Sequence, residues 1–158
     1  MNAVIQHRMK NWRHDGPQAL EIMVLDTVDA HRPSKYLDRA RAAGLGWGRP
    51  ETWDAFFAAK TRRLWFPHGS TDSFTLISRG RVELAHDQEG DWDGDRIGHP
   101  ESDGYFGFSG LSISEDGSEA IVGWYWHCGS LCADGWVSRL VFEEGEWRLA
   151  ETQGLWIS

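Results

Sequence analysis

The sequence predicts an α+β protein, in which a twisted and curved antiparallel sheet carries N-terminal helices packed on one face. Apolar residues recur at three- and four-residue spacing in the first half of the chain, as they do in amphipathic helices. From Phe74 onward the apolar period changes to two, as it does in strands. Helices that come early and antiparallel strands that come late are typical of this class.

The N-terminal half supplies one expected strand and two expected helices. Residues 21–28 are short and apolar, which indicates a strand. Ser34 can cap a helix that runs to about Ala43, and Pro50 can open a second helix. The residues that recur at helical spacing in the second helix are Trp53, Phe56, Phe57, Lys60 and Leu64. This stripe should pack against the sheet.

The remaining chain is expected to form strands joined by short turns. The expected strands are residues 74–78, 81–85, 108–114, 119–127, 136–143 and 146–157. Asp116-Gly117 is a strong hairpin signal, and Glu144-Gly145 marks a second hairpin. Both parities of 119–127 are apolar, so this strand should be central and covered on both faces. Residues 87–104, rich in Asp and Gly, should form a long loop.

Composition and length predict one domain that spans residues 1–158. Hydrophobic residues make up 41% of the 158 and charged residues 25%, which are ordinary globular values. No apolar stretch is long enough to cross a membrane, and the first 16 residues contain no apolar run that could direct export. We therefore expect a cytoplasmic protein without a membrane partner.

The charge is unevenly distributed. The formal net charge is −8, with 11 Lys and Arg against 8 Asp and Glu up to Ser78, and 5 against 16 after it. An acidic surface repels phosphate backbones, which argues against a nucleic-acid partner. One hypothesis is therefore an acidic protein-binding domain, such as an immunity-type inhibitor of a basic toxin or enzyme, with the carboxylates between Asp87 and Asp103 as its contact surface.

Ten tryptophans suggest a different function. Tryptophan gathers in cores, ligand pockets and interfaces. The leading hypothesis is a small-molecule-binding protein with an aromatic-lined pocket for an apolar or aromatic ligand. It could also be a cofactor-independent enzyme of the cyclase or isomerase type. The expected acid and base groups are Tyr125 and His127, on one face of the central strand. The expected ligand-binding residues are Trp124, Trp126, Trp136 and Phe56.

Two further segments could carry chemistry. Cys128 and Cys132 admit four interpretations: two buried thiols, a short-loop disulfide, a metal site that includes His127, or a catalytic thiol. Their spacing is not the C-x₂-C of zinc sites, so no metal is assigned to them. The alternating carboxylates of residues 91–95 resemble a calcium loop, but the glycine and glutamate positions of an EF-hand fall on Arg96 and Ser102. We expect a solvated loop or a lid there.

Residues 105–158 resemble a family of small, largely uncharacterised bacterial domains. That family carries a Cys-Gly-x-Leu-Cys-Gly turn and a C-terminal Trp-Ile-Ser. The matching segments are residues 108–109, 120–122, 128–132, 145–147 and 156–158. Ala133 stands where the family has a glycine after the second cysteine. The resemblance implies no reaction. The chain also lacks a nucleophile elbow, a P-loop, a dinucleotide fingerprint and a His-Glu-x-x-His motif.

Overall fold

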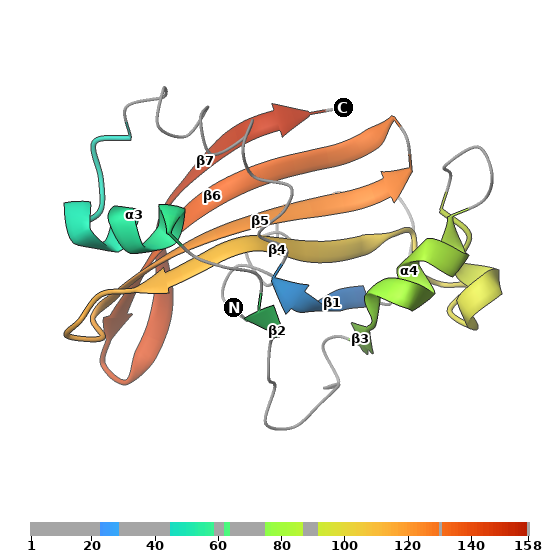
Figure 1. Cartoon of the computed structure of the whole chain (residues 1–158), viewed down its shortest axis with the longest axis horizontal. Coiled ribbons are helices and arrows are strands. Elements are labelled where there is room, and N and C mark those ends of the chain that lie inside the picture. Colours follow the sequence, from blue (N-terminus) through green and yellow to red (C-terminus); the bar gives the residue numbers. More distant parts are fainter. Residues whose placement is uncertain are drawn as a thin grey trace.

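The computed structural model describes residues 23–28, 45–58, 62–63, 75–86, 92–129 and 131–157. Its elements, in chain order, are β1 (Met23–Val28), α3 (Pro50–Phe57), β2 (Arg62–Arg63), β3 (Thr75–Ile77), α4 (Arg79–Ala85), the 3₁₀ helix η1 (Gly94–Ile97), β4 (Tyr105–Ile113), β5 (Glu119–Gly129), β6 (Cys132–Glu143) and β7 (Glu146–Ile157) (Figure 1).

Four long strands, β4 to β7, form an antiparallel meander in which each strand pairs with the next. Figure 1 shows them as long, twisted and bent ribbons, and the sheet does not close into a barrel. The predicted turns are confirmed. Glu144 and Gly145 have φ of 55° and 86°, as the two-residue hairpin turn between β6 and β7 requires. The connection between β4 and β5 is longer: the Gly117 N–H donates to the Ser114 carbonyl at 2.9 Å, and Gly117 has a φ of 71°.

The sheet is mixed rather than wholly antiparallel. β1 runs parallel to β4, with Met23 opposite Tyr105. β3 also pairs with β1 in parallel, and β2 pairs with it antiparallel. The antiparallel prediction therefore holds for the meander and is wrong for the strand that joins it. This is because a parallel neighbour reached through a long connection leaves no hairpin signal in the sequence.

Two predicted elements need correction. Residues 81–85 are part of helix α4 rather than a strand, and Val82 and Ala85, three residues apart on the helix, are both buried. The helix that begins at Pro50 ends at Phe57, and Arg62–Arg63 is a short strand, so the helix does not continue to Leu64. The predicted helix over residues 34–43 lies outside the described residues.

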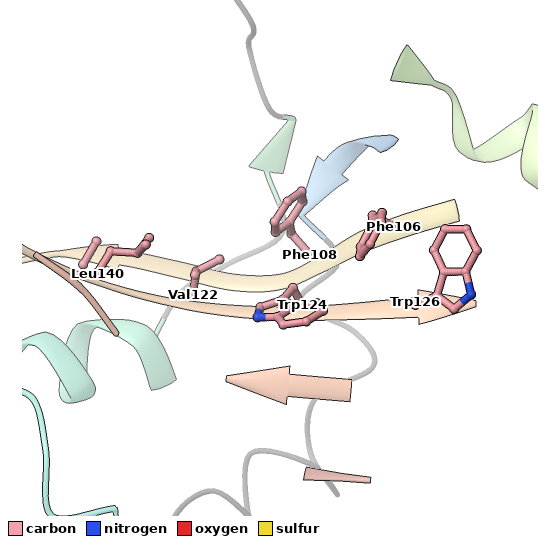
Figure 2. Packing of buried hydrophobic residues seen from close by; sticks show 7 residues of the cluster. Phe106, Phe108, Val122, Trp124, Trp126 and Leu140 are labelled. Atoms are coloured by element: carbon pink, nitrogen blue, oxygen red, sulfur yellow. The ribbon is translucent and has the colours of Figure 1, made fainter. Parts of the chain in front are cut away.

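The meander has two chemically different faces. One, called here the tryptophan face, carries a buried cluster that consists of Phe106, Phe108, Ala120, Val122, Trp124, Trp126 and Leu140 (Figure 2). The opposite side, called the helix face, packs Phe56 of α3 with Ile121 and Val137. It also packs Val82 and Ala85 of α4 with Tyr105 and Tyr125. Residues 119–126 of β5 are buried whichever face they point to, as the absence of alternation predicted.

Candidate functional site

An open groove of about 380 Å³ lies where the segment before β4 meets the end of β5. Three of its lining side chains are carboxylates, and none of the described residues that line it is basic. The lining residues are Trp92, Asp93, Gly94, Asp95, Pro100, Ser102, Asp103 and Cys128. All but Cys128 belong to the Asp- and Gly-rich stretch that the sequence marks as a loop or lid.

The described part of that stretch, residues 92–104, is held by hydrogen bonds. The Asp93 carboxylate accepts the backbone N–H of Asp95 at 3.1 Å, which caps η1. Gly98 ends η1 in the left-handed conformation, with a φ of 76° that glycine adopts without strain. The Trp92 indole N–H donates to the Ser102 carbonyl at 2.7 Å, and the Asp93 N–H donates to the Ala85 carbonyl at 2.5 Å. The groove wall is therefore tied to the end of α4.

A disulfide between Cys128 and Cys132 borders the groove. The two Cα atoms are 5.2 Å apart, within the range that a disulfide spans. Of the four interpretations of this pair, the structure shows the short-loop disulfide. Cys128 occupies the bulge where the register between β5 and β6 shifts, and it lines the groove, whereas Cys132 is exposed at the start of β6.

Four aromatic or titratable rings pack behind Trp92. His86 and Trp92 are joined by an isolated bridge, with ring centroids 5.8 Å apart. The His127 ring stacks on Tyr105 at 5.4 Å and meets His86 edge-on at 4.9 Å. Tyr125 meets Tyr105 at 6.2 Å. The structure thus brings the two predicted acid and base groups, Tyr125 and His127, into one cluster and adds His86 and Tyr105 to them.

The predicted ligand-binding tryptophans lie on the other side of the sheet. Trp124 stacks on Trp136 with centroids 5.7 Å apart, and its indole N–H donates to the Ser138 hydroxyl at 2.9 Å. Trp126 packs against Phe106 at 4.9 Å, and Figure 2 shows both with Trp124 along β4 and β5. The backbone of the sheet therefore separates these tryptophans from Tyr125 and His127.

Phe56, the fourth predicted ligand-binding residue, is packed on the helix face. Its ring lies over Gly110 and Gly123, where an added Cβ would come within 2.7 Å and 3.1 Å of it. The ring is 2% exposed and contacts Ile121 and Val137. Phe56 of the predicted stripe therefore packs against the sheet. The predicted site residues therefore occupy three separate environments.

Sequence reasoning missed a charged network that joins α3 to the sheet. Glu119 is 2% exposed; its carboxylate accepts the Arg49 backbone N–H at 2.8 Å and the Arg139 guanidinium at 2.7 Å. Burial acts to raise the pKa of Glu119, but hydrogen bonds from Arg49, Arg139 and Thr52 outweigh it, so that the pKa is lowered. Hydrogen bonds from Arg49, Ser114 and Ser118 similarly hold the pKa of Asp116 well below its usual range.

The described residues contain no group of three or more His, Cys, Asp or Glu side chains that could hold a metal ion. Asp93 and Asp95, from the segment that resembles a calcium loop, instead line the groove. In the part of the chain that the structure describes, no helix is long and apolar enough to span a membrane.

Comparison with known proteins leaves the function to be argued from this site. No family model, curated protein or solved structure matches the chain.

Proposed function

We propose that this protein is an acidic protein-binding domain that receives a basic partner at the groove. The observation that carries the proposal is the convergence of Asp93, Asp95 and Asp103 beside Trp92 on one open wall. An immunity-type inhibitor of a basic toxin or enzyme is the kind of protein that fits. The same segment is the contact surface that the charge distribution favours.

Two features of the groove favour a basic partner: its carboxylates and the Trp92 ring beside them. Carboxylates at an open groove attract Lys and Arg side chains from a distance and raise the association rate with a basic partner. Trp92 offers a flat apolar ring in the same wall, and its indole N–H is already bonded to the Ser102 carbonyl. A guanidinium can stack on such a ring while it bonds a neighbouring carboxylate. The groove therefore suits an arginine-rich surface.

The test compares two triple variants with equal charge change. Asp93→Asn/Asp95→Asn/Asp103→Asn removes the groove carboxylates, and asparagine still caps η1. Glu115→Gln/Glu143→Gln/Glu144→Gln removes exposed carboxylates from the turns at the opposite end of β5 and β6. The association rate with the basic partner purified from the same source should fall about tenfold in the groove variant at low salt and much less in the control. Equal effects would refute the groove as the contact site.

A second candidate is the small-molecule-binding protein, supported by the half-buried Trp136 that stacks on Trp124. A planar apolar or aromatic ligand could extend this stack on the tryptophan face.

In the enzymatic version, a cofactor-independent cyclase or isomerase, Tyr125 and His127 are the acid and base, with substrate on the helix face. Trp136→Ala should abolish binding of an apolar fluorescent dye, while Trp147→Ala, also half-buried on the tryptophan face, should not. A wild-type protein that binds no such dye would eliminate this candidate.

We further propose that residues 1–158 form one α+β domain of the small, largely uncharacterised bacterial family with the Cys-Gly-x-Leu-Cys-Gly turn. Its N-terminal helices would pack on the helix face, and its location would be cytoplasmic. The packing of Phe56 on Gly110 and Gly123 supports this arrangement. Amide hydrogen exchange of the full chain tests it, because residues 34–43 should be protected as a helix.

A further inference from the structure

We propose that the Cys128–Cys132 disulfide is a thiol-exchange site that is attacked at Cys132 and prefers a thiol carried beside a positive charge. This goes beyond the proposed function, because exchange at Cys132 requires no protein partner. The charge preference rests on the same groove carboxylates as that function. Small thiols of known charge can therefore test the two separately.

The geometry of the hairpin tip distinguishes the two sulfurs. Gly129 pairs with Cys132, so β5 turns into β6 through a two-residue connection. Leu131, in that connection, is 87% exposed, and Cys132 beside it is exposed as well. Cys128 is half-buried and packs against the buried cluster on the tryptophan face. Cys132 is therefore the more exposed of the two bonded cysteines, and Cys128 is the one that lines the groove, so we expect an incoming thiolate to attack Cys132.

The exchange is a balanced substitution at sulfur. An external thiolate attacks the Sγ of Cys132, an S–S bond forms between them, and the Cys128–Cys132 bond breaks. Cys128 leaves as a thiolate at the groove wall and takes a proton from water. A second external thiolate then displaces Cys132 from the mixed disulfide. The external thiol is oxidised to its disulfide, and the two protein cysteines are reduced.

Charge at the groove sets which thiols react fastest. Asp93, Asp95 and Asp103 share the groove lining with Cys128, which is bonded to the attacked Cys132, so an anionic thiolate that approaches Cys132 does so against their long-range field. A thiol that also carries an ammonium group is attracted by that field. A reductant of this chemistry is either a small aminothiol or a cysteine flanked by Lys or Arg in a peptide.

The first experiment locates the attack. The native protein is treated with cysteamine, quenched with acid, alkylated and digested, and the adduct is mapped by mass spectrometry. The thiol should be on Cys132 and the alkyl group on Cys128, by at least tenfold over the reverse. An adduct mainly on Cys128, or a bond that resists millimolar cysteamine for hours in the folded protein, would overturn the proposal.

The second experiment measures charge preference. The rate of reduction of the protein disulfide is measured with cysteamine and with 2-mercaptoethanesulfonate. Each rate is divided by the rate at which the same thiol reduces hydroxyethyl disulfide, so that differences in the intrinsic reactivity of the two thiols cancel. The ratio of the corrected cysteamine rate to the corrected 2-mercaptoethanesulfonate rate should be about ten at low salt and should fall toward unity at 1 M salt. Asp95→Asn should reduce the ratio, whereas Glu115→Gln, about 30 Å away along β5 at about 3.3 Å per residue, should not. A ratio near unity at low salt in the wild type would overturn the preference.

A lysine-flanked cysteine peptide distinguishes the source of the thiol. If it exceeds cysteamine in corrected rate, the hairpin tip selects a polypeptide. If it does not, a small aminothiol is the fitting reductant. Exchange without any binding of a basic partner would refute the proposed function alone, and binding without exchange would refute this inference alone.

Discussion

Glu119→Gln should be the most costly removal of a single charge among the described carboxylates. The substitution keeps the shape of the side chain and its acceptor for the Arg49 N–H, but it removes the negative charge that Arg139 faces at 2.7 Å. Hydrogen bonds to charged groups contribute about 1.5–3 kcal/mol each. Breaking a fully buried ion pair costs about 3–5 kcal/mol. Arg139 is a quarter exposed and retains Glu151, so we expect a loss of about 2 kcal/mol.

Urea unfolding at pH 7 measures this loss, with Glu151→Gln as the control. The Glu151 side chain also bonds Arg139, at 2.8 Å, but it is 39% exposed. Its removal should cost less than about 1 kcal/mol, as exposed ion pairs do. If the two variants lose equal stability, or if Glu119→Gln loses less than about 0.5 kcal/mol, burial of the Glu119 carboxylate is not what makes this network strong.

The same pair predicts a pH dependence with a definite sign. The pKa of Glu119 in the folded protein lies below its ordinary value of 4.5. Its stabilising contribution is therefore fully present above about pH 4.5 and is lost as the pH falls through the folded pKa. The stability difference between wild type and Glu119→Gln should be constant from pH 5 to 8 and should shrink below pH 4.5. A difference that grows on acidification would contradict the sign.

Two further substitutions test the packing on the helix face. Phe56→Ala should cost about 3–5 kcal/mol in urea unfolding, because it empties the space over Gly110 and Gly123, while Phe57→Ala, half-buried, should cost distinctly less. Gly107→Ala would place a methyl group in the space that the Tyr125 ring occupies and should destabilise the protein by about 1–3 kcal/mol. An unchanged near-UV circular dichroism spectrum in Gly107→Ala would show that Tyr125 does not pack there.

Local pattern predicted the meander well. Two of its three turns contain an Asp-Gly or Glu-Gly pair, and its strands have period-two or wholly apolar patterns, so these elements are specified by neighbours in the chain. Helix α4 was missed because charged Arg81 and Glu83 alternate with apolar Val82 and Leu84, in a five-residue window that suits either period. Its identity is decided by contact with Tyr105 and Tyr125, which lie about twenty to forty residues further on.

The candidate site was predicted only in part, for a similar reason. The acidic segment was recognisable from composition, and the short-loop disulfide was one of the interpretations left open. The small-molecule hypothesis assigned Trp124, Trp126 and Tyr125 to one site, whereas the structure places the two tryptophans and Tyr125 in different clusters on opposite faces of the sheet. The partners of these residues could not be predicted, since His86 reaches His127, and Arg49 reaches Glu119, only through the tertiary fold.

The connectivity of the sheet has a consequence for the order in which the chain folds. Short turns connect the consecutive strands of the β4–β7 meander, so its three hairpins can form from contacts between residues that are close in the sequence. β1 joins the edge of β4 only after a connection of more than seventy residues is closed, which costs more chain entropy. We expect the C-terminal third of the chain to acquire amide protection early in refolding, and the pairing of β1 with β4 to be the last step in assembling the sheet.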